Sequence, residues 1–466
     1  MEELKLYFIK YCSYDLKQRL AKDQKQKNNY TPNDLEAFWM PFTANQDFKA
    51  DPRIISKSKG MYYYTPNGDK ILDAVAGLWC CNAGHNREEI VKAIQEQAAE
   101  LDFVPSFQAG HYKAFELSNK LTDISPENLN HVFYSNSGSE AVETALKIAL
   151  AYFRTIGKPS KRILIGRERG YHGTGFGGLS VGGIVNNKKQ FERFLPDVYH
   201  LPHTHNLEHN SYSKGQPAWG AHLADDLLKQ IERHGADNIA AVIVEPVAGS
   251  TGVLIPPVGY LEKLRKICTD NDIILIFDEV ITGFGRLGKP FAADFFNIEP
   301  DLMTIAKGLT SGTVPMAATF VSDKIYKTFM NGDPKVIDFF HGYTYSAHPL
   351  ACAAAIATLD VYKKDNLLIR ASEIAKYWED ALHSLKGTKH IIDIRNLGLI
   401  GAIELESVPE KPSRRAYNVL CEAFRDQKLF VRVTGDIIAL SPPLIIQKQE
   451  IDLIVERLKK TISSTQ

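Results

Sequence analysis

Short apolar runs alternate with amphipathic helical patterns through the middle of the chain, and this alternation limits the folds that the sequence can adopt. Residues 239–244 (IAAVIV) and 273–277 (IILIF) contain no polar side chain. Such continuous runs are typical of parallel strands covered on both faces, whereas a strand with one wet face alternates apolar and polar residues. A helical pattern over residues 261–270 connects the two runs. The succession strand–helix–strand predicts a doubly wound α/β domain.

The same succession extends toward the N-terminus. The sequence predicts strands at residues 130–134 and 162–165, and helices at residues 90–101 and 140–153. In the second of these helices the apolar side chains recur at helical spacing, as on the buried face of an amphipathic helix. We therefore expect a large, mostly parallel sheet domain over residues 79–346.

The pattern changes near residue 347. An alanine-rich helix is predicted at residues 348–362, and residues 392–406 predict a bent pair of strands. We expect the C-terminal segment 347–466 to form a smaller α+β domain together with part of the N-terminal segment 1–78.

Charge and composition exclude several classes of protein. The chain has 466 residues with 55 Lys plus Arg and 55 Asp plus Glu, so it has no net charge to attract nucleic acid or a membrane surface. No apolar run approaches the length of a membrane span, and the polar stretch 17–29 indicates a flexible leader. Six scattered cysteines without a CxxC pair are typical of reduced thiols, so we expect a cytoplasmic protein.

The first candidate site follows the strand predicted at 130–134. Ser137, Gly138 and Ser139 stand directly before the predicted helix 140–153. Free backbone N–H groups and hydroxyls at the positive end of a helix suit a phosphate group. Taken alone, the same residues would more often be a plain helix N-cap.

Three further apolar runs each end in a charged residue. Residues 239–244 are followed by Glu245, residues 273–277 by Asp278, and the run DLMTIA by Lys307. In open α/β sheets ligands bind outside the carboxyl ends of the strands, so these three side chains can converge. Taken alone, each carboxylate could instead cap a loop or pair with an arginine.

Taken together, the phosphate cup, the aspartate and the lysine match one cofactor. A buried lysine has a lowered pKa and becomes a nucleophile toward carbonyl groups. A buried carboxylate needs a cation, which a protonated pyridine nitrogen supplies. Pyridoxal phosphate (PLP) carries an aldehyde, a pyridine nitrogen and a phosphate, so we predict a PLP site built on Lys307 and Asp278.

At these residues the chain resembles the class III (omega) aminotransferases, which have PLP fold type I. The resemblance is carried by residues 275–309, LIFDEVITGFGRLGKPFAADFFNIEPDLMTIAKGL. Further stretches, among them GLWCCNAGH, GYHGTGF and VRVTGD, are similar to those of beta-alanine (omega-amino acid):pyruvate aminotransferases within that family. The resemblance runs from about residue 39 to the C-terminus.

The resemblance implies a role for each matching cofactor residue. Lys307 would bind the cofactor aldehyde and later move a proton, and Asp278 would pair with the ring nitrogen. Val280 would pack beneath the ring and Tyr171 above it. The implied cofactor-binding residues are Ser137, Gly138, Ser139, Tyr171, Glu245, Asp278, Val280, Lys307 and Thr344.

The resemblance also implies substrate contacts and a partner subunit. Arg432 would clamp a substrate carboxylate with two hydrogen bonds, and Trp79 would line the substrate pocket. Thr344 would reach the phosphate of the neighbouring subunit, so a homodimer or homotetramer with shared active sites is expected. Neither a metal nor nucleic acid nor a membrane is expected as a partner.

Two positions depart from the family pattern. Relatives that act on 4-aminobutyrate or ornithine carry a glutamate where this chain has Ser250, in EPVAGSTG, so the Glu–Arg switch of those enzymes is absent. This favours pyruvate over 2-oxoglutarate as the amino acceptor, with Arg432 swinging in for a carboxylate and out for an apolar end. Seven residues beyond Arg432, this chain has Ala439 in place of a polar residue.

These expectations describe a transaminase that moves the amino group of beta-alanine to pyruvate by a ping-pong mechanism, giving malonate semialdehyde and L-alanine. Taurine, 4-aminobutyrate, diamines and simple amines are alternative donors. A PLP aminomutase or decarboxylase on the same scaffold is a second reading, and a non-catalytic binding protein is a third.

Other motifs were given less weight. The run HLPHTHNLEH could suit a metal ion, but Pro202 and the polar neighbours favour a surface loop, so no metal site is expected. Arg395 is interpreted as a structural salt-bridge residue. Two GxGxxG matches, which begin at Gly173 and Gly283, lack the helix opening of a dinucleotide site.

Overall fold

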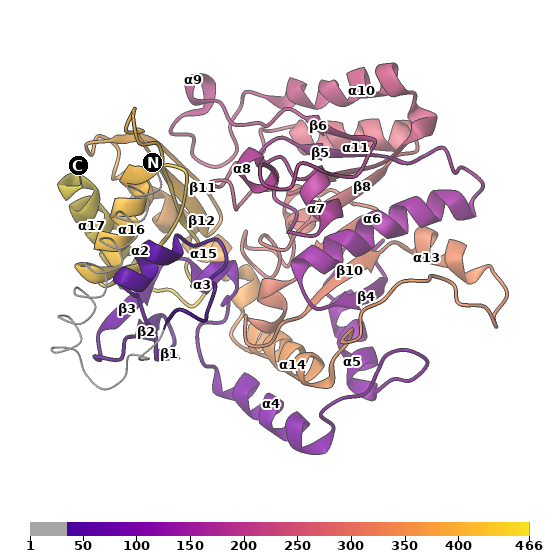
Figure 1. Cartoon of the computed structure of the whole chain (residues 1–466), viewed down its shortest axis with the longest axis horizontal. Helices are drawn as coiled ribbons and strands as arrows, with labels where there is room; N and C mark the ends of the chain where they lie inside the picture. The colour runs from indigo at the N-terminus through magenta and orange to yellow at the C-terminus, as the bar shows by residue number, and fades with distance from the viewer. Residues whose placement is uncertain (1–34, 466) are drawn as a thin grey trace, which may run out of the picture.

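The computed structural model describes residues 35–465, which form one large sheet and two small ones (Figure 1). The leader expected at residues 17–29 lies outside the described residues. None of the helices that the structure describes combines the length and the apolarity needed to cross a membrane.

The large sheet confirms the expected mostly parallel α/β architecture. Its strand order is β4-β10-β9-β8-β7-β5-β6, and only β10 runs antiparallel to its two neighbours. Four predicted strands are confirmed to within two residues. The strands are β4 (His131–Ser135), β5 (Ile163–Arg167), β6 (Val198–Leu201), β7 (Ile239–Val244), β8 (Ile274–Asp278), β9 (Leu302–Ile305) and β10 (Ala317–Val321).

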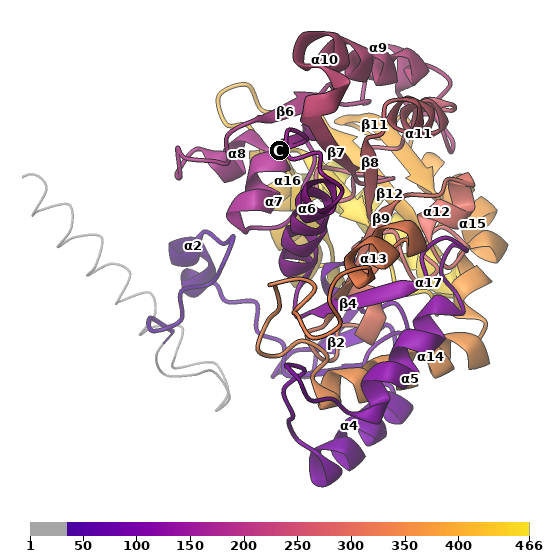
Figure 2. The ribbon, with the colours of Figure 1, turned by 90° about the vertical axis from the view of Figure 1, so that its right-hand side faces the viewer.

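Helices cover both faces of this sheet, which explains its continuous apolar strands. In β7, Ala241 and Ile243 pack with the apolar face of α6 (Gly138–Thr155), whereas Val242 and Val244 belong to the core on the other face, with residues of α11 (Tyr260–Asp270). Figure 2 shows α6 and α7 on one side of the sheet and α11 and α12 on the other. The expected helices at 140–153 and 261–270 are therefore confirmed.

Further helices surround this layer, and the helix expected at 90–101 is confirmed as α4. They are α4 (Glu88–Glu100), α5 (Tyr112–Thr122), α7 (Phe176–Val181), α8 (Val185–Lys188), α9 (Leu207–Asn210), α10 (Asp226–His234), α12 (Ala292–Phe296) and α13 (Asp323–Met330), with short 3₁₀ helices η1 (Ala221–Asp225), η2 (Ala236–Asn238) and η3 (Lys307–Thr310).

A glycine in β5 lets α7 approach the sheet closely. A Cβ atom at Gly166 would lie 1.8 Å from the carbonyl oxygen of Val181, the last residue of α7. Backbone cannot move aside as a side chain can, so only glycine fits at this point. This contact holds the loop that precedes α7, which carries Tyr171 and His172, over the carboxyl ends of the strands.

The two small sheets contain segments from both ends of the chain. In the first sheet, β3 pairs in parallel with β13, which joins the N-terminal and C-terminal segments as expected. The second sheet has the order β11-β12-β15-β14 and contains the expected strand pair. The strands are β1 (Lys57–Lys59), β2 (Tyr62–Tyr64), β3 (Lys70–Asp73), β11 (Ile391–Leu397), β12 (Ile400–Leu405), β13 (Leu429–Phe430), β14 (Arg432–Thr434) and β15 (Ile437–Leu440).

The alanine-rich helix is confirmed as α14 (Pro349–Lys364). It packs against α4 and α5 as well as α15 (Leu367–His383), so it touches both parts of the molecule (Figure 1). The exact boundary at residue 347 stays a prediction. The remaining helices are α2 (Asn45–Ala50), α3 (Ala76–Trp79), α16 (Arg414–Arg425) and α17 (Lys448–Ser464).

Candidate active site

One cavity at the carboxyl ends of the strands gathers most of the residues that the sequence indicated. It is formed by the ends of β7, β8 and β9, the start of α6 and the loop before α7. The lining residues are Gly138, Ser139, Tyr171, His172, Gly173, Glu245, Asp278, Val280, Ile281, Ala306 and Lys307. The prediction that the three charged strand ends converge is therefore confirmed, because Glu245, Asp278 and Lys307 line the same cavity.

Lys307 enters this cavity from a strained turn. It follows β9 after one extended residue and begins η3, with a backbone φ of 47°. A side chain other than glycine in this left-handed region costs on the order of 1–3 kcal/mol, and such strain is common at functional sites. Burial lowers the pKa of the Lys307 amine, because the charged form loses its hydration.

Asp278, the last residue of β8, is held by three donors. His172 Nδ1 lies 2.8 Å from its Oδ2, while the Val280 N–H and the Thr304 hydroxyl each lie 3.2 Å from its Oδ1. His172 Nε2 has no hydrogen-bond partner in the described part of the chain. The stretch GYHGTGF carries part of the resemblance, but the sequence does not predict the role of His172, because nothing in the spacing links it to a strand more than 100 residues away.

Glu245, at the end of β7, is buried and bonded only to backbone donors. Its Oε1 accepts from the Tyr171 N–H at 2.9 Å and its Oε2 from the Gly249 N–H at 3.1 Å. Burial raises the pKa of this carboxyl to about 7, and the nearby Asp278 adds to the shift. Glu245 therefore ties two loops of the cavity together and is protonated in an appreciable fraction of molecules at neutral pH.

The start of α6 forms the expected cup. Ser137 is the N-cap, and its Oγ accepts from the Glu140 N–H at 3.2 Å. The first N–H groups of an 18-residue helix have no intrahelical acceptor and can hold an anion. A Cβ at Gly138 would lie 3.0 Å from Val280 Cγ1, so glycine lets the helix start lie against Val280.

Four expected site residues lie outside the residues that line this cavity: the N-cap Ser137, and also Arg432, Trp79 and Thr344. Arg432, the first residue of β14, is half-buried near Tyr171, and burial lowers its pKa. Trp79 is buried in the core, and its indole Nε1 has no partner among the described residues. Thr344 is exposed on the surface of this chain. Their substrate and cofactor roles stay predictions.

The two arginines of the second small sheet differ sharply. Arg395 binds Asp393 and Glu404, and it also donates to the carbonyl groups of Gly252 and Val253 at 2.7–3.1 Å. Its interpretation as a structural residue is confirmed. Arg432 has no carboxylate within ion-pair distance among residues 35–465.

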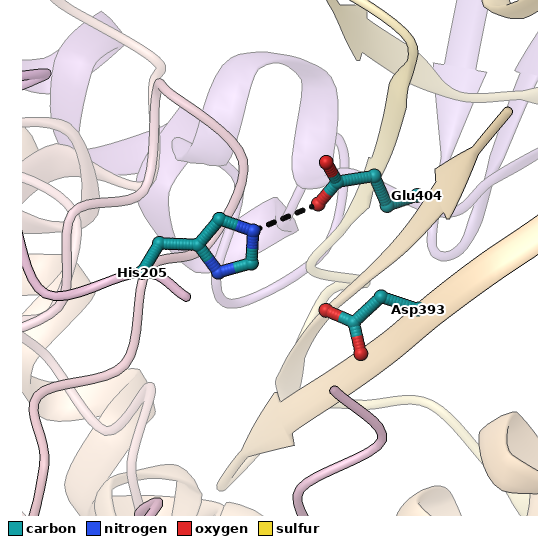
Figure 3. A group of neighbouring side chains, drawn as sticks. All are labelled: His205, Asp393 and Glu404. Atoms are coloured by element: carbon teal, nitrogen blue, oxygen red, sulfur yellow. Dashed lines mark ion pairs between the residues drawn. The ribbon is translucent and has the colours of Figure 1, made fainter. Parts of the chain in front are cut away.

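The histidine-rich segment is not a plain surface loop as expected. His200 lies in β6, and the largely buried His205 ring lies 3.1 Å from Glu404, with Asp393 beside it (Figure 3). The contact with β12 half-buries His205, whereas residues 207–209 of the same segment are exposed, as their polarity predicts. The Arg395 guanidinium already supplies a cation to both carboxylates, so this group is an ion-pair network.

A larger cavity of about 560 Å³ lies elsewhere, where α6 ends and β8 begins. It includes Arg265, Asp272 and Asp301 and none of the expected site residues. Arg265 and Asp301 form a salt bridge there, which leaves no unpaired charge between them.

Comparisons with known proteins agree with this geometry. The family model described as aminotransferase class-III matches residues 43–462. The chain belongs to the class III aminotransferases. It is 58% identical to an omega-aminotransferase of Caulobacter vibrioides (93% of this chain, 99% of that protein) and 47% identical to a beta-alanine–pyruvate aminotransferase of Pseudomonas aeruginosa (92% and 96%).

The comparison with solved structures identifies the cofactor. A PLP-bound amine transaminase from an uncultivated Pseudomonas species matches with a TM-score of 0.86 at 33% identity, covering 93% of this chain and 99% of that one. The protein is therefore a PLP-dependent omega-amino acid transaminase of fold type I, which takes an amino donor and a keto acid. The cavity fits PLP, because it offers an amine of lowered pKa, a fixed carboxylate and an open helix N-terminus.

The raised pKa of Glu245 predicts a pH-dependent stability of the apo-enzyme. The folded state binds this proton more tightly than the unfolded chain, so the free energy of unfolding should fall as pH rises from about 4.5 to about 7. Glu245→Gln removes this contribution, which is on the order of 3 kcal/mol. Urea unfolding from pH 5 to 8 measures it as the difference between the two proteins.

Glu279 provides an internal comparison, because burial raises its pKa to about 7 as well. The Glu245→Gln variant should therefore keep part of the pH dependence. Parallel stability curves for the wild type and the variant would contradict a protonated Glu245.

Proposed function

We propose that this enzyme transfers the amino group of beta-alanine to pyruvate, giving malonate semialdehyde and L-alanine. The observation that carries the proposal is a cavity in which Lys307 and Asp278 meet the open start of α6, with Arg432 nearby and without a carboxylate partner among the described residues. The similar P. aeruginosa enzyme is named for beta-alanine and pyruvate, which supports the choice of substrates.

Bound PLP supplies a reactive aldehyde and an electron-withdrawing ring. We assign the anchoring of its phosphate to Ser137, Gly138 and Ser139, whose N–H groups open the 18-residue helix α6. Gly138 leaves room for the close approach, and the hydroxyl of Ser139 already orients the neighbouring loop through the Thr174 N–H at 3.1 Å.

The proton chemistry follows from three side chains. Asp278 keeps a proton on the ring nitrogen, because its negative charge stabilises the protonated pyridine. His172, at 2.8 Å, fixes the direction of this carboxylate. Lys307 has a lowered pKa, so its free amine can take the proton from the amino-bearing carbon of the donor and would deliver it to the C4′ carbon of bound PLP.

Arg432 is proposed to bind the carboxylates of both substrates in turn. Its cross-strand neighbour is Ala439, which has no polar atom to hold the guanidinium. Ser250 lies in the loop that also contains Gly249 and Gly252, and a serine there has no charge to draw Arg432 away from the substrate. A free arginine can form the bidentate pair with a substrate carboxylate.

The deciding experiment follows the absorbance of the PLP-loaded enzyme with one substrate at a time. Beta-alanine alone should abolish the band of the lysine-bound cofactor, and pyruvate should restore it, because the two half-reactions are separate. Lys307→Ala should lack this band and nearly all turnover. An aminomutase would not need pyruvate for turnover.

If beta-alanine leaves the band unchanged, it is not the donor. Taurine, 4-aminobutyrate, diamines and simple amines would then be tested in the same way. A normal band in Lys307→Ala would reject the assignment of Lys307.

Arg432→Ala should weaken the binding of substrates that carry a carboxylate more than the binding of substrates that lack one. We expect the KM for beta-alanine and pyruvate to rise on the order of 100-fold, because a bidentate charged pair is lost. The KM for an amine without a carboxylate should change less than about threefold. Arg425→Ala is the matched control, because Arg425 lies on the surface and pairs with Asp51. Equal effects on both substrate classes would contradict a carboxylate clamp.

We further propose a homodimer, in which Thr344 completes the site of the second copy. Thr344 is exposed, and Phe340 and Tyr345 beside it are 83% and 57% exposed. Large exposed apolar groups of this kind mark an interface, and the second copy is the occupant that gives Thr344 a role. Light scattering of the PLP-loaded enzyme should give at least twice the mass of one chain; a single-chain mass would contradict the shared site.

A further inference from the structure

The turn that carries Lys307 is short and needs support from other elements. Lys307 has its backbone in the left-handed region, and so does Ser311, the residue after η3, which has a φ of 50°. Two bonds of this turn are internal. The Ser311 N–H donates to the Gly308 carbonyl at 3.2 Å, and the Gly312 N–H donates to the Lys307 carbonyl at 3.2 Å. Bonds inside a turn define its shape, but they do not fix its position in the protein.

One side of the turn is fixed by packing. A Cβ atom at Gly308 would lie 2.8 Å from Asn82 Nδ2 and 3.0 Å from Phe284 Cβ, so the turn lies directly against these two residues. Asn82 is itself held, because its Nδ2 donates to the Phe284 carbonyl at 3.0 Å and its Oδ1 accepts from Arg286 at 2.8 Å. This wall blocks movement of the turn toward Asn82 and Phe284, but it does not block movement away from them.

A second restraint is a hydrogen bond from a distant helix, whose tyrosine ring also lies beside the Phe284 ring, with the ring centroids 6.1 Å apart. The hydroxyl of Tyr362, near the end of α14, donates to the Gly308 carbonyl at 2.5 Å. Tyr362 is fully buried, and burial raises the pKa of its phenol, so it stays a neutral donor over the working pH range. Its hydroxyl also contacts that of Ser311, which accepts from the Ala83 N–H at 3.0 Å.

We propose that Tyr362 is a positioning residue for Lys307: its hydroxyl fixes the Gly308–Leu309 peptide, directly after Lys307, beside the Asn82–Phe284 wall. The hydrogen bond holds the amine over the cavity and out of water. The proposal rests on the proposed role of Lys307. It adds a residue that touches neither the cavity nor the cofactor site and lies 55 positions further along the chain.

Tyr362→Phe tests the hydrogen bond alone, because the ring is kept. With PLP and the donor, we expect kcat to fall about tenfold or more while the KM of the donor stays within about twofold, because a misplaced group slows the reaction without weakening binding. Tyr212→Phe is the matched control. It removes a similar bond, from the Tyr212 hydroxyl to the Ile391 carbonyl at 3.0 Å, outside the site.

A second readout uses the apo-enzyme and no catalysis. Acetic anhydride labels free amines, and peptide mass spectrometry gives the extent of labelling at Lys307 as a function of pH. In Tyr362→Phe the midpoint should move toward the ordinary lysine value, because a released turn exposes the amine to water. Tyr212→Phe should leave the midpoint unchanged.

Wild-type kcat and an unmoved labelling midpoint in Tyr362→Phe would overturn the proposal. A wild-type enzyme without lysine-bound cofactor would instead overturn the proposed role of Lys307, so the two failures are distinct. If Tyr362→Phe does not fold, Ser311→Ala replaces it, because the Ser311 hydroxyl contacts that of Tyr362 and ties the same turn to the Ala83 N–H. A smaller midpoint shift in the same direction is expected there, and no shift would overturn the proposal.

Discussion

The site depends on the burial of one amine at the end of a strand. Lys307 must lose its hydration, occupy an unfavourable backbone conformation and still point into the cavity. Desolvation and strain each oppose this arrangement, and only a rigid surrounding structure can maintain it. The doubly wound sheet supplies the rigidity, because β8 and β9 are covered on both faces and end at the same edge.

The two carboxyl groups near the Lys307 amine have different surroundings. Asp278 receives three donors, among them His172, and these fix the position of its carboxyl group. Glu245, one strand away, has only two backbone donors, and burial raises its pKa to about 7. Two neighbouring carboxyls thereby differ in their surroundings: Asp278 is held by a histidine, a threonine and a backbone N–H, and Glu245 joins two loops through backbone donors.

Two arginines of one small sheet also differ in their surroundings. Arg395 is surrounded by two carboxylates and by the carbonyl groups of the loop that follows β7, so it locks the small sheet onto the large one. Arg432 lies on the other edge strand, opposite Ala439, and none of the described carboxylates pairs with it. Residue type alone does not separate the two roles, whereas the surroundings do.

The sequence by itself determined four strands of the large sheet, the main helices and the three charged strand ends. These features are local: apolar runs and helical spacing follow from neighbouring residues, and the carboxyl end of a parallel strand has a known direction. For this reason Lys307, Asp278, Glu245 and the cup at Gly138 were predicted, and the structure places them in one cavity.

Only the tertiary structure decided which side chains support them. His172 lies against Asp278, Tyr362 against Gly308, and His205 against Glu404, at separations of 54 to 199 positions along the chain. Such pairs leave no periodic signal in a single sequence, because hydrogen bonds between distant segments depend on how the layers pack. The sequence thus specified the reactive groups, and the packing specified how firmly each is held.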